Sequence, residues 1–418
     1  MVIIMKETVK IGYIGVGRRG FGMLRACFSQ MKDVCIKTIC DLVPERIARG
    51  QEIVLEKGGY TPAGTTDYHE ILNDPEIDAV VIMTGWSGRP ALAIESMKAG
   101  KYTAIEVGCA DTVEECFDLV RTYEETGVPV MMLENCCYGR REMMLYNMVR
   151  QGLFGEIVHC TGGYMHYLNE VELFKDIGDH YRLPHYVDRN RENYPTHELG
   201  PLSKLLRVNR SNRIVSLSSF ASKSRGLKQY AKDHLGADHE LAQTDFKQGD
   251  IVTTVLTCAG GETVVLTLDT TLPRAYYSRN IGVRGTKGMS YEDTRVVFLE
   301  GMEEKVRDNE AEFFEKYDHP LHREYEAMGT RGGHGGMDWL VCRAFVESVK
   351  NGTDTPIDAY DTATWLSIGV LSEQSIKQGG MPMEVPDFTH GLWQTDRPIV
   401  RGKYCLDEVC EDPSVPIF

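Results

Sequence analysis

The sequence predicts an α/β protein: a Rossmann-type, doubly wound parallel sheet, followed by an α+β domain with an open, mostly antiparallel sheet. Two observations carry this prediction. Strand and helix patterns alternate over about the first 135 residues, with short connections. Later in the chain, several strands follow one another with turns between them. The 418 residues suit two domains, which we place at 1–138 and 139–418.

Short apolar runs rich in β-branched residues mark the first strands. The run at 9–14 leads through a glycine turn into a helical segment, and the run at 34–40 ends at an aspartate. The same reasoning predicts further strands at 79–83, 102–107 and 128–133, and helices at 91–99 and 113–126.

The pattern changes after residue 139. A polar stretch at 169–194 is longer than an ordinary connection, so we expect a functional loop or lid there. Around it we predict a helix at 142–151, strands at 157–163, 214–220, 251–258, 263–270, 280–284 and 295–299, and closing helices at 337–351 and 360–378. The closing helices are expected to pack back onto the rest of the chain.

Composition excludes several classes of partner. A net charge of −15 opposes binding to nucleic acid and to anionic membranes, and the sequence contains no apolar run of about 18 residues. The twelve cysteines have irregular spacings that suit reduced, buried thiols better than a zinc site. The N-terminus lacks a signal-peptide pattern. We therefore expect a cytoplasmic protein that binds no metal.

Three glycines follow the first predicted strand and open a helix. Gly15 permits a tight turn, Gly17 lets the backbone approach a pyrophosphate, and Gly20 lets helix and strand pack closely. The helix N-terminus offers unpaired amides to phosphate oxygens. Asp41, at the end of the second strand, would accept a hydrogen bond from a ribose 2′-hydroxyl and repel a 2′-phosphate. This combination predicts NAD, in preference to NADP.

A second motif ends the strand that should lie beside the nicotinamide. Glu106-Val107-Gly108 resembles the Glu-Lys-Pro motif of the Gfo/Idh/MocA oxidoreductases, in which a Rossmann domain precedes an open-sheet substrate domain. Val107 replaces the lysine that usually transfers protons in that family. The replacement argues against ordinary alcohol dehydrogenation.

A narrower resemblance covers nearly the whole chain. The chain is similar to glycoside hydrolase family 109, the NAD-dependent α-N-acetylgalactosaminidase-like branch. The matching stretches are VMMLEN at 130–135, NMVRQGLFGE at 147–156, YPTHELGP at 194–201, SLSSFASKSRG at 216–226, GTKG at 285–288 and GHGGMD at 333–338.

This resemblance implies a redox-assisted hydrolysis. NAD⁺ oxidises the sugar at C3, the C2 proton becomes acidic, and its loss expels the aglycone from C1. Water then adds, and the cofactor reduces C3 again. Such chemistry needs acid–base groups at C2 and at the C3 oxygen. It does not need the paired carboxylates of an ordinary glycosidase.

The resemblance also implies roles for individual residues. His197 would be the base at the C3 hydroxyl, and Tyr164 would take the C2 proton. Imidazole titrates near neutral pH, whereas a phenol at its ordinary pKa of about 10 needs a cationic neighbour or an acidified sugar. By the resemblance, the further substrate positions are Arg182, Tyr194 and Tyr277, and we add Glu134, His166 and His334 as candidates. The positions that fall on NAD are Arg18, Arg19, Asp41, Trp86, Arg89, Glu106, Val107 and Asn135.

Structural interpretations of the same residues stay open. Thr196 could cap a helix in which His197 is structural, and Tyr164 could be an ordinary core residue on its strand. Where the family commonly reads Trp-Glu-Trp-His, this chain has Trp86-Ser-Gly-Arg89, and the extra arginine would also suit an anionic sugar such as a sulfoquinovoside.

Two rival functions remain. One is a net sugar or glycoside 3-dehydrogenase, which would accumulate NADH. The other is a non-catalytic NAD-sensing protein, which would need no proton-transfer groups. In each case we expect a small-molecule ligand and a homodimer or homotetramer, because an open sheet usually buries its outer face against another copy.

Overall fold

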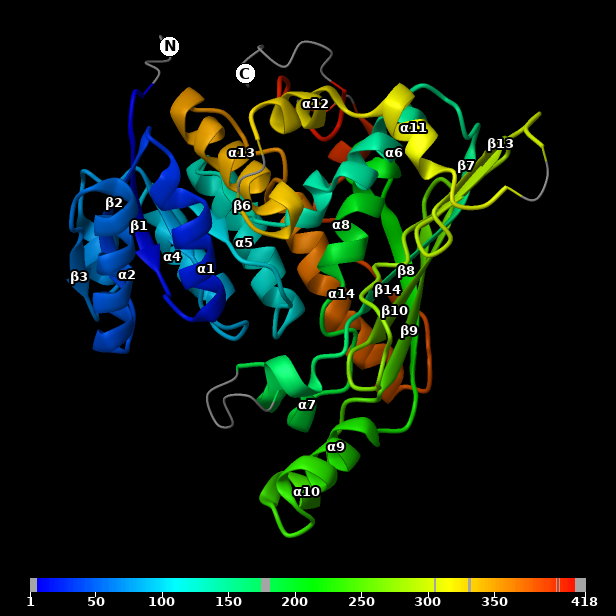
Figure 1. Ribbon diagram of the computed structural model, residues 1–418, viewed down its shortest axis with the longest axis horizontal. Helices are drawn as coiled ribbons and strands as arrows, with labels where there is room; N and C mark the ends of the chain where they lie inside the picture. The colour runs from blue at the N-terminus through cyan, green and yellow to red at the C-terminus, as the bar shows by residue number, and fades with distance from the viewer. Residues whose placement is uncertain are drawn as a thin grey trace.

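The computed structural model describes residues 6–173, 181–303, 306–329, 332–395, 397 and 399–409. Figure 1 shows a sheet at the blue, N-terminal end, a larger open sheet on the opposite side, and a layer of helices between them. Within the described residues, no helix has the length and apolar character needed to span a membrane.

The first sheet has the predicted Rossmann topology. Its strands are β1 (Val9–Ile14), β2 (Val34–Cys40), β3 (Ala63–Thr65), β4 (Ala79–Ile82), β5 (Tyr102–Ile105) and β6 (Val130–Met132). Their order is β3-β2-β1-β4-β5-β6, and every neighbouring pair is parallel. The order reverses direction between β1 and β4, and ligands of such sheets bind at the carboxyl ends of the strands near this switch.

Local side chains set the helix ends in this part of the chain. The helices are α1 (Arg18–Ala26), α2 (Pro44–Gly58), α3 (His69–Asn73), α4 (Arg89–Lys98) and α5 (Val113–Thr126), with short 3-10 turns η1 (Phe28–Gln30) and η2 (Asn135–Tyr138). In α5, Thr112 and Glu115 form a reciprocal capping box, and Gly127 ends the helix with φ 65°. The predicted bounds 113–126 are therefore confirmed.

The second sheet is open and mostly antiparallel, as predicted. It contains β7 (Ile157–Met165), β8 (Ile214–Ala221), β9 (Ile251–Cys258), β10 (Thr263–Asp269), β11 (Gly282–Gly285), β12 (Gly288–Tyr291), β13 (Val296–Leu299) and β14 (Met383–Glu384). The order is β13-β12-β11-β7-β10-β9-β8-β14, and only β7 and β10 run parallel. Buried and half-buried residues alternate along β9, which is typical of a strand covered on one face.

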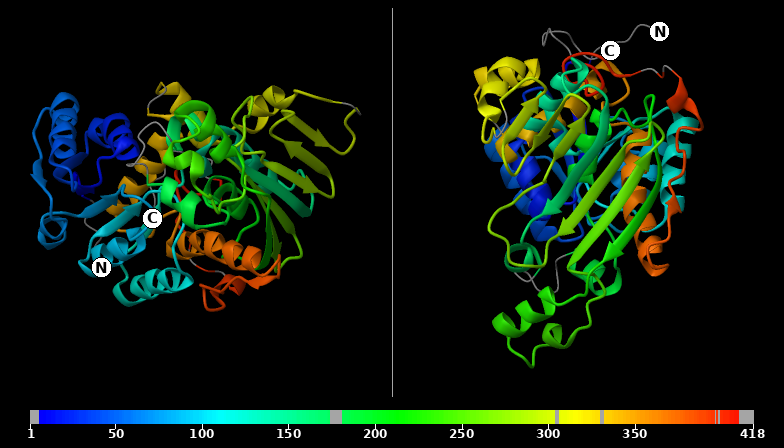
Figure 2. Two further views of the ribbon diagram at one scale, coloured as in Figure 1. Left: turned by 90° about the horizontal axis from the view of Figure 1, so that it is seen from below. Right: turned by 90° about the vertical axis from the view of Figure 1, so that its right-hand side faces the viewer.

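The chain forms further helices before, between and after these strands, and those that pack on the sheet cover its inner face. The further helices are α6 (Arg140–Arg150), α7 (Leu183–Asp188), α8 (Thr196–Leu205), α9 (Gly226–Leu235), α10 (Glu240–Gln243), α11 (Glu310–Tyr317), α12 (Pro320–Ala327), α13 (Met337–Asn351) and α14 (Ala359–Lys377), with η4 (His334–Gly336) and η5 (Leu392–Gln394). Helix α8 packs on β7, and α14 packs on both β8 and α5, so α14 joins the two halves of the molecule. The right-hand view of Figure 2 shows the other face of the sheet without a covering helix.

The stretch predicted as a long loop carries more structure than expected. A π-helical turn spans Asn169–Leu173, and α7 follows at Leu183–Asp188. Residues 174–180 lie outside the described residues. Short helices formed here because apolar residues such as Leu173 and Tyr186 are buried against the body of the protein.

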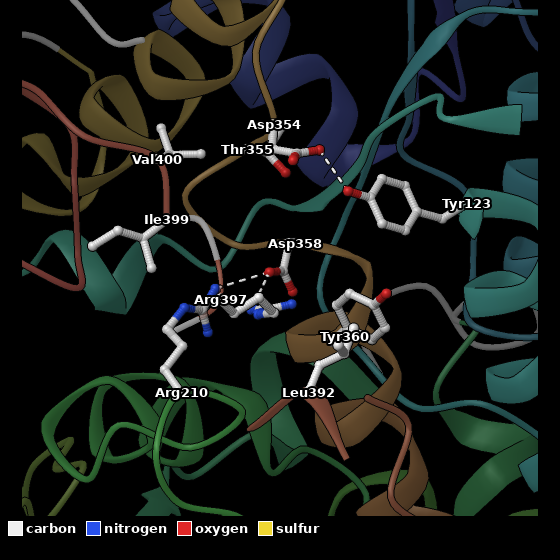
Figure 3. Close-up of a pocket in the computed structure, with 10 residues that line it drawn as sticks. All are labelled: Tyr123, Arg210, Asp354, Thr355, Asp358, Tyr360, Leu392, Arg397, Ile399 and Val400. Carbon is white, nitrogen blue, oxygen red and sulfur yellow. Dashed lines mark hydrogen bonds and ion pairs between the residues drawn. The ribbon is translucent and has the colours of Figure 1, made fainter. Parts of the chain in front are cut away.

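A buried ionic cluster ties the C-terminal segment to α8 and α14. Asp361, fully buried at the start of α14, pairs with Lys204 and with Arg210, each at 2.7 Å. Asp358 pairs with Arg210 at 2.9 Å and with Arg397 at 2.6 Å. Figure 3 shows these arginines beside a small pocket of about 160 Å³. Because each cation faces a carboxylate, we interpret the cluster as a structural clamp.

Removing one member of this clamp should destabilise the fold. Asp361→Asn would remove the carboxylate that the buried Lys204 and Arg210 share, and removing one partner of a buried pair costs about 3–5 kcal/mol. We expect a clear fall in the thermal unfolding midpoint, measured by circular dichroism. The matched control is Asp245→Asn, which breaks an exposed pair with Lys228 and should leave the midpoint unchanged. Equal behaviour of the two variants would contradict the clamp.

Candidate active site

The glycine turn after β1 has the shape that a dinucleotide needs. Gly15 has φ 93°, and a Cβ on Gly20 would lie 2.2 Å from the Gly15 carbonyl oxygen, so both positions require glycine. A Cβ on Gly17, by contrast, would meet no atom within 4 Å, so this backbone faces open space. Helix α1 begins at the next residue without a side-chain cap. Its first amides are therefore available to phosphate oxygens.

Asp41 holds the glycine turn in place from the end of β2. One of its carboxylate oxygens accepts the Val16 amide at 2.7 Å, and the other accepts the Val43 amide at 3.0 Å. Each carboxylate oxygen has a second lone pair. Asp41 can thus accept a ribose hydroxyl while it fixes the turn, and the residues at this edge fit NAD.

The ends of β4 and β5 carry four further predicted cofactor residues. Trp86 is buried, and its indole fills the space beside Gly108. Arg89 is buried as well, and its guanidinium donates to the backbone carbonyls of Thr84, Glu106 and Val107. Because these carbonyls occupy it, the guanidinium is not presented to a sugar. This arrangement removes the reason for expecting an anionic sugar at Arg89.

An ion-pair network lies beside these strand ends. Arg19 forms two hydrogen bonds of 2.8 Å with Asp338 and pairs with Glu106 at 3.3 Å. Asn135 also donates to Asp338, at 2.7 Å, and His334 contacts the same carboxylate at 2.9 Å. The structure therefore groups His334 with predicted cofactor residues, although we expected it beside the substrate. Arg18, the neighbouring predicted position, is exposed.

Asp338 was not predicted as a site residue. Burial raises the pKa of its carboxyl, but the hydrogen bonds and charges of His334 and Arg19 outweigh burial and hold the pKa well below its ordinary value. The carboxylate consequently stays charged. The only signal in the sequence was its place at the end of the GHGGMD stretch.

Aromatic side chains from three segments gather next to the cofactor edge. The ring of Tyr164 on β7 lies 4.4 Å from that of Tyr194 and 5.5 Å from that of His197. Tyr194 lies 5.8 Å from Trp86, so the cluster is continuous with the Rossmann edge. Tyr277 borders it at 6.2 Å from Tyr164. Four predicted catalytic or substrate residues thus form one group.

His166 belongs to the same group. Its Nδ1 lies 3.2 Å from the Tyr164 hydroxyl oxygen, and its ring lies 5.1 Å from that of Tyr277. Tyr164 is 5% exposed, which also agrees with the core interpretation. Its hydroxyl nevertheless points to a second titratable side chain, as a proton-transfer residue requires.

A buried carboxylate orients His197. Nδ1 of His197 lies 2.7 Å from Glu134, which is fully buried and also accepts the Cys136 amide at 3.0 Å. Burial raises the pKa of Glu134, but the charge and hydrogen bond of His197 outweigh it and keep the pKa below its ordinary value. Helix α8 begins at Thr196, but the start of the helix has no side-chain cap.

Glu134, Cys136 and His197 also place potential metal-ligand atoms within 4.8 Å of one another. Arg279 donates to the Cys136 sulfur at 3.4 Å, and a fixed cation at that distance opposes a metal ion. Burial raises the pKa of the Cys136 thiol well above its ordinary value, so the ligand form is disfavoured. We interpret these three residues as part of a hydrogen-bond network.

Arg182 covers the aromatic group from the start of α7. Its guanidinium lies 4.7 Å from the centre of the Tyr194 ring and 5.7 Å from that of Trp86, and its Nε donates to the Tyr181 hydroxyl at 3.2 Å. Tyr181 in turn packs over Gly85. A buried cation therefore closes one side of the site.

Two buried carboxyls beside this group were not predicted. Glu192 and Glu198 are fully buried, and no described residue hydrogen-bonds to their four carboxyl oxygens. Burial raises the pKa of Glu192 to about 8, and burial together with Glu192 raises the pKa of Glu198 well above its ordinary value. No sequence pattern distinguishes them from surface glutamates, because their burial follows from the packing of α8 and α14.

Comparison with known proteins gives consistent matches along the chain. Residues 9–134 match the model described as an oxidoreductase family, NAD-binding Rossmann fold, and residues 138–395 match that of the glycosyl hydrolase 109 C-terminal domain. An α-N-acetylgalactosaminidase of Tannerella forsythia is 39% identical over 92% of this chain and 87% of its own. Another, of Shewanella oneidensis, is 37% identical over 94% and 88%.

Solved structures share the fold. Levoglucosan dehydrogenase, in complex with NADH and levoglucosan, superposes with a TM-score of 0.69 at 18% identity, covering 91% of this chain and 100% of that one. A scyllo-inositol dehydrogenase of Lactobacillus casei gives a TM-score of 0.64 at 14% identity, covering 91% and 99%.

The buried carboxyl of Glu192 should make stability depend on pH. Its pKa is about 8 in the folded protein but about 4.3 in an unfolded chain. Between these values the folded state binds more protons, so the free energy of unfolding falls as pH rises. The unfolding midpoint of the wild type should therefore fall more steeply than that of Glu192→Gln between about pH 5 and about pH 8.

The exposed Glu300 supplies the control for this measurement. Glu300→Gln should follow the wild-type pH profile. Parallel profiles for wild type and Glu192→Gln would show that Glu192 is charged throughout this range.

Proposed function

The chain belongs to glycosyl hydrolase family 109, and on this premise we propose that it hydrolyses N-acetylgalactosaminides or a related glycoside through transient oxidation at C3. It is a glycoside hydrolase that uses NAD as its cofactor. The observation that carries the mechanistic proposal is the grouping of Tyr164, Tyr194 and His197 beside Trp86 at the cofactor edge.

We assign the cofactor to the carboxyl edge of the first sheet. Gly15, Gly17 and Gly20 admit the pyrophosphate, and Asp41 receives the ribose. When bound there, NAD supplies a reversible oxidation of the sugar at C3. Glu106, Asn135 and the network of Arg19 and Asp338 lie where they can shape the nicotinamide end of the pocket.

His197 would accept the proton of the C3 hydroxyl. If its Nδ1–H donates to Glu134, Nε2 keeps a free lone pair and acts as the base. Glu134 thereby fixes both the tautomer and the ring orientation, and it stabilises the imidazolium that forms. In this assignment Glu134 is a positioning residue.

Tyr164 would take the C2 proton once C3 is a ketone. The bond between C1 and the aglycone oxygen then breaks as the C1–C2 double bond forms. In its protonated form His166, whose Nδ1 lies 3.2 Å from the hydroxyl oxygen, would supply the cationic neighbour that a phenolate requires. In the second half-reaction the oxygen of water bonds to C1 and the proton held by Tyr164 returns to C2, before C3 is reduced. The proton that the water loses balances the proton that the departing aglycone oxygen takes up.

A net glycoside 3-dehydrogenase is the second candidate. Levoglucosan dehydrogenase and scyllo-inositol dehydrogenase share the fold, but Val107 offers no proton-transfer group where that chemistry usually places a lysine. An NAD sensor needs no proton-transfer group, so it would not require the hydrogen bond by which Glu134 orients His197.

We also propose that the enzyme is a cytoplasmic homodimer or homotetramer. The outer face of the second sheet carries half-buried threonine and valine side chains on β9 and β10 and has no covering helix. The eleven cysteines that the structure describes are free thiols, which suits a reducing compartment.

The proposal predicts hydrolysis without net reduction. Purified enzyme incubated with 4-nitrophenyl α- and β-glycosides, including N-acetylgalactosaminides, should release nitrophenol while the absorbance of NADH stays constant. His197→Ala and Tyr164→Phe should each lower kcat by about 100-fold or more. Steady growth of NADH without nitrophenol would identify a dehydrogenase and overturn the proposal.

The positioning role of Glu134 makes a separate prediction. Glu134→Gln should lower kcat by about 10–100-fold with little change in KM. It should also shift the acidic limb of the kcat–pH profile to lower pH, because the carboxylate no longer stabilises the imidazolium. A loss of kcat without a shift of the profile would assign Glu134 a packing role only.

A further inference from the structure

Arg89 is a buried cation at the cofactor edge. It is the first residue of α4 and 3% exposed. Its Nη1 donates to the carbonyl of Val107 at 2.7 Å and to that of Glu106, and its Nη2 donates to that of Thr84. No described residue accepts a hydrogen bond from its Nε. One guanidinium thus hydrogen-bonds to backbone carbonyls that follow both β4 and β5.

The partners of Arg89 are neutral. The carboxylate of Glu106 acts on it electrostatically but pairs with Arg19, at 3.3 Å. Buried arginines ordinarily pair with a carboxylate, because an isolated buried charge is costly. Here three charge-assisted hydrogen bonds to backbone carbonyls stabilise the cation, and no carboxylate of the described residues pairs with it directly.

The charge of Arg89 is also permanent. Burial lowers its pKa, but arginine remains protonated at neutral pH because its ordinary pKa is above about 12. The other groups that face it are Tyr181, Tyr194 and Cys109. Burial raises the pKa of Tyr194 and of Cys109, so neither provides a counter-charge near neutral pH.

We propose that Arg89 biases the bound cofactor toward its reduced form, by placing a fixed positive charge under the nicotinamide end of the pocket. The nicotinamide ring is cationic in NAD⁺ and neutral in NADH. A nearby permanent cation therefore disfavours the oxidised form more than the reduced form. This inference rests on the proposed placement of NAD along the ends of β4 and β5.

The bias has a mechanistic value for a cofactor that is regenerated in every cycle. It favours oxidation of the C3 hydroxyl, the step that starts the reaction, and it keeps C3 oxidised while the aglycone leaves. The final reduction of C3 is opposed to the same extent. Since arginine does not titrate near neutral pH, the bias is independent of pH.

The test compares affinities for the two cofactor forms. Dissociation constants for NAD⁺ and NADH are measured by titration calorimetry on full-length enzyme after the bound cofactor has been exchanged out. Arg89→Gln should lower the ratio of the NAD⁺ constant to the NADH constant by about tenfold, equivalent to about 1.4 kcal/mol. Arg89→Lys, which keeps the charge, should preserve the wild-type ratio.

The possible outcomes separate this inference from the proposed function. An equal loss of affinity for both forms in Arg89→Gln, or an unchanged ratio, would overturn the bias and leave Arg89 a structural residue. If Arg89→Gln does not fold, Arg89→His at about pH 8 supplies the uncharged side chain instead. Wild-type enzyme that binds neither form would contradict the cofactor assignment itself.

Discussion

The hydrogen bond between Glu134 and His197 connects the two halves of the molecule at the point where the chemistry is proposed. Glu134 follows β6, the last strand of the Rossmann sheet, whereas His197 stands in the first turn of α8, which packs on β7 of the open sheet. The proposed base, on a helix that packs against the second sheet, is therefore held by a carboxylate that follows the last strand of the first sheet. The aromatic group can keep its geometry only while the two sheets keep their relative position.

The large-scale fold could be predicted because it rests on local patterns. Strand β1 and helix α5 have the predicted bounds, since alternation, glycines and a capping box act over a few residues. The strand predicted at 128–133 is reduced to Val130–Met132. Its end depends on pairing with β5, which no local pattern reveals.

Some residues of the candidate site could likewise be predicted from local patterns, and others could not. Tyr164, Tyr194 and His197 could be found from motifs, and the structure brings them together. Arg19, by contrast, forms its hydrogen bonds with Asp338, which lies 319 residues away. No local sequence pattern links the two residues. Arg89 was identified as a cofactor position, but the sequence could not show that its guanidinium would bind backbone carbonyls. Burial of Glu192 and Glu198 is a property of the packed helices alone.

The separation between Arg19 and Asp338 has a consequence for biosynthesis. All six strands of the first sheet lie within the first 132 residues, so that sheet can form while the ribosome is still translating the rest of the chain. The second sheet pairs His159 with Thr263 across its parallel junction, a contact that needs much more of the chain. Asp338 emerges later still. The nascent protein can therefore hold the complete first sheet well before Asp338 is available to pair with Arg19.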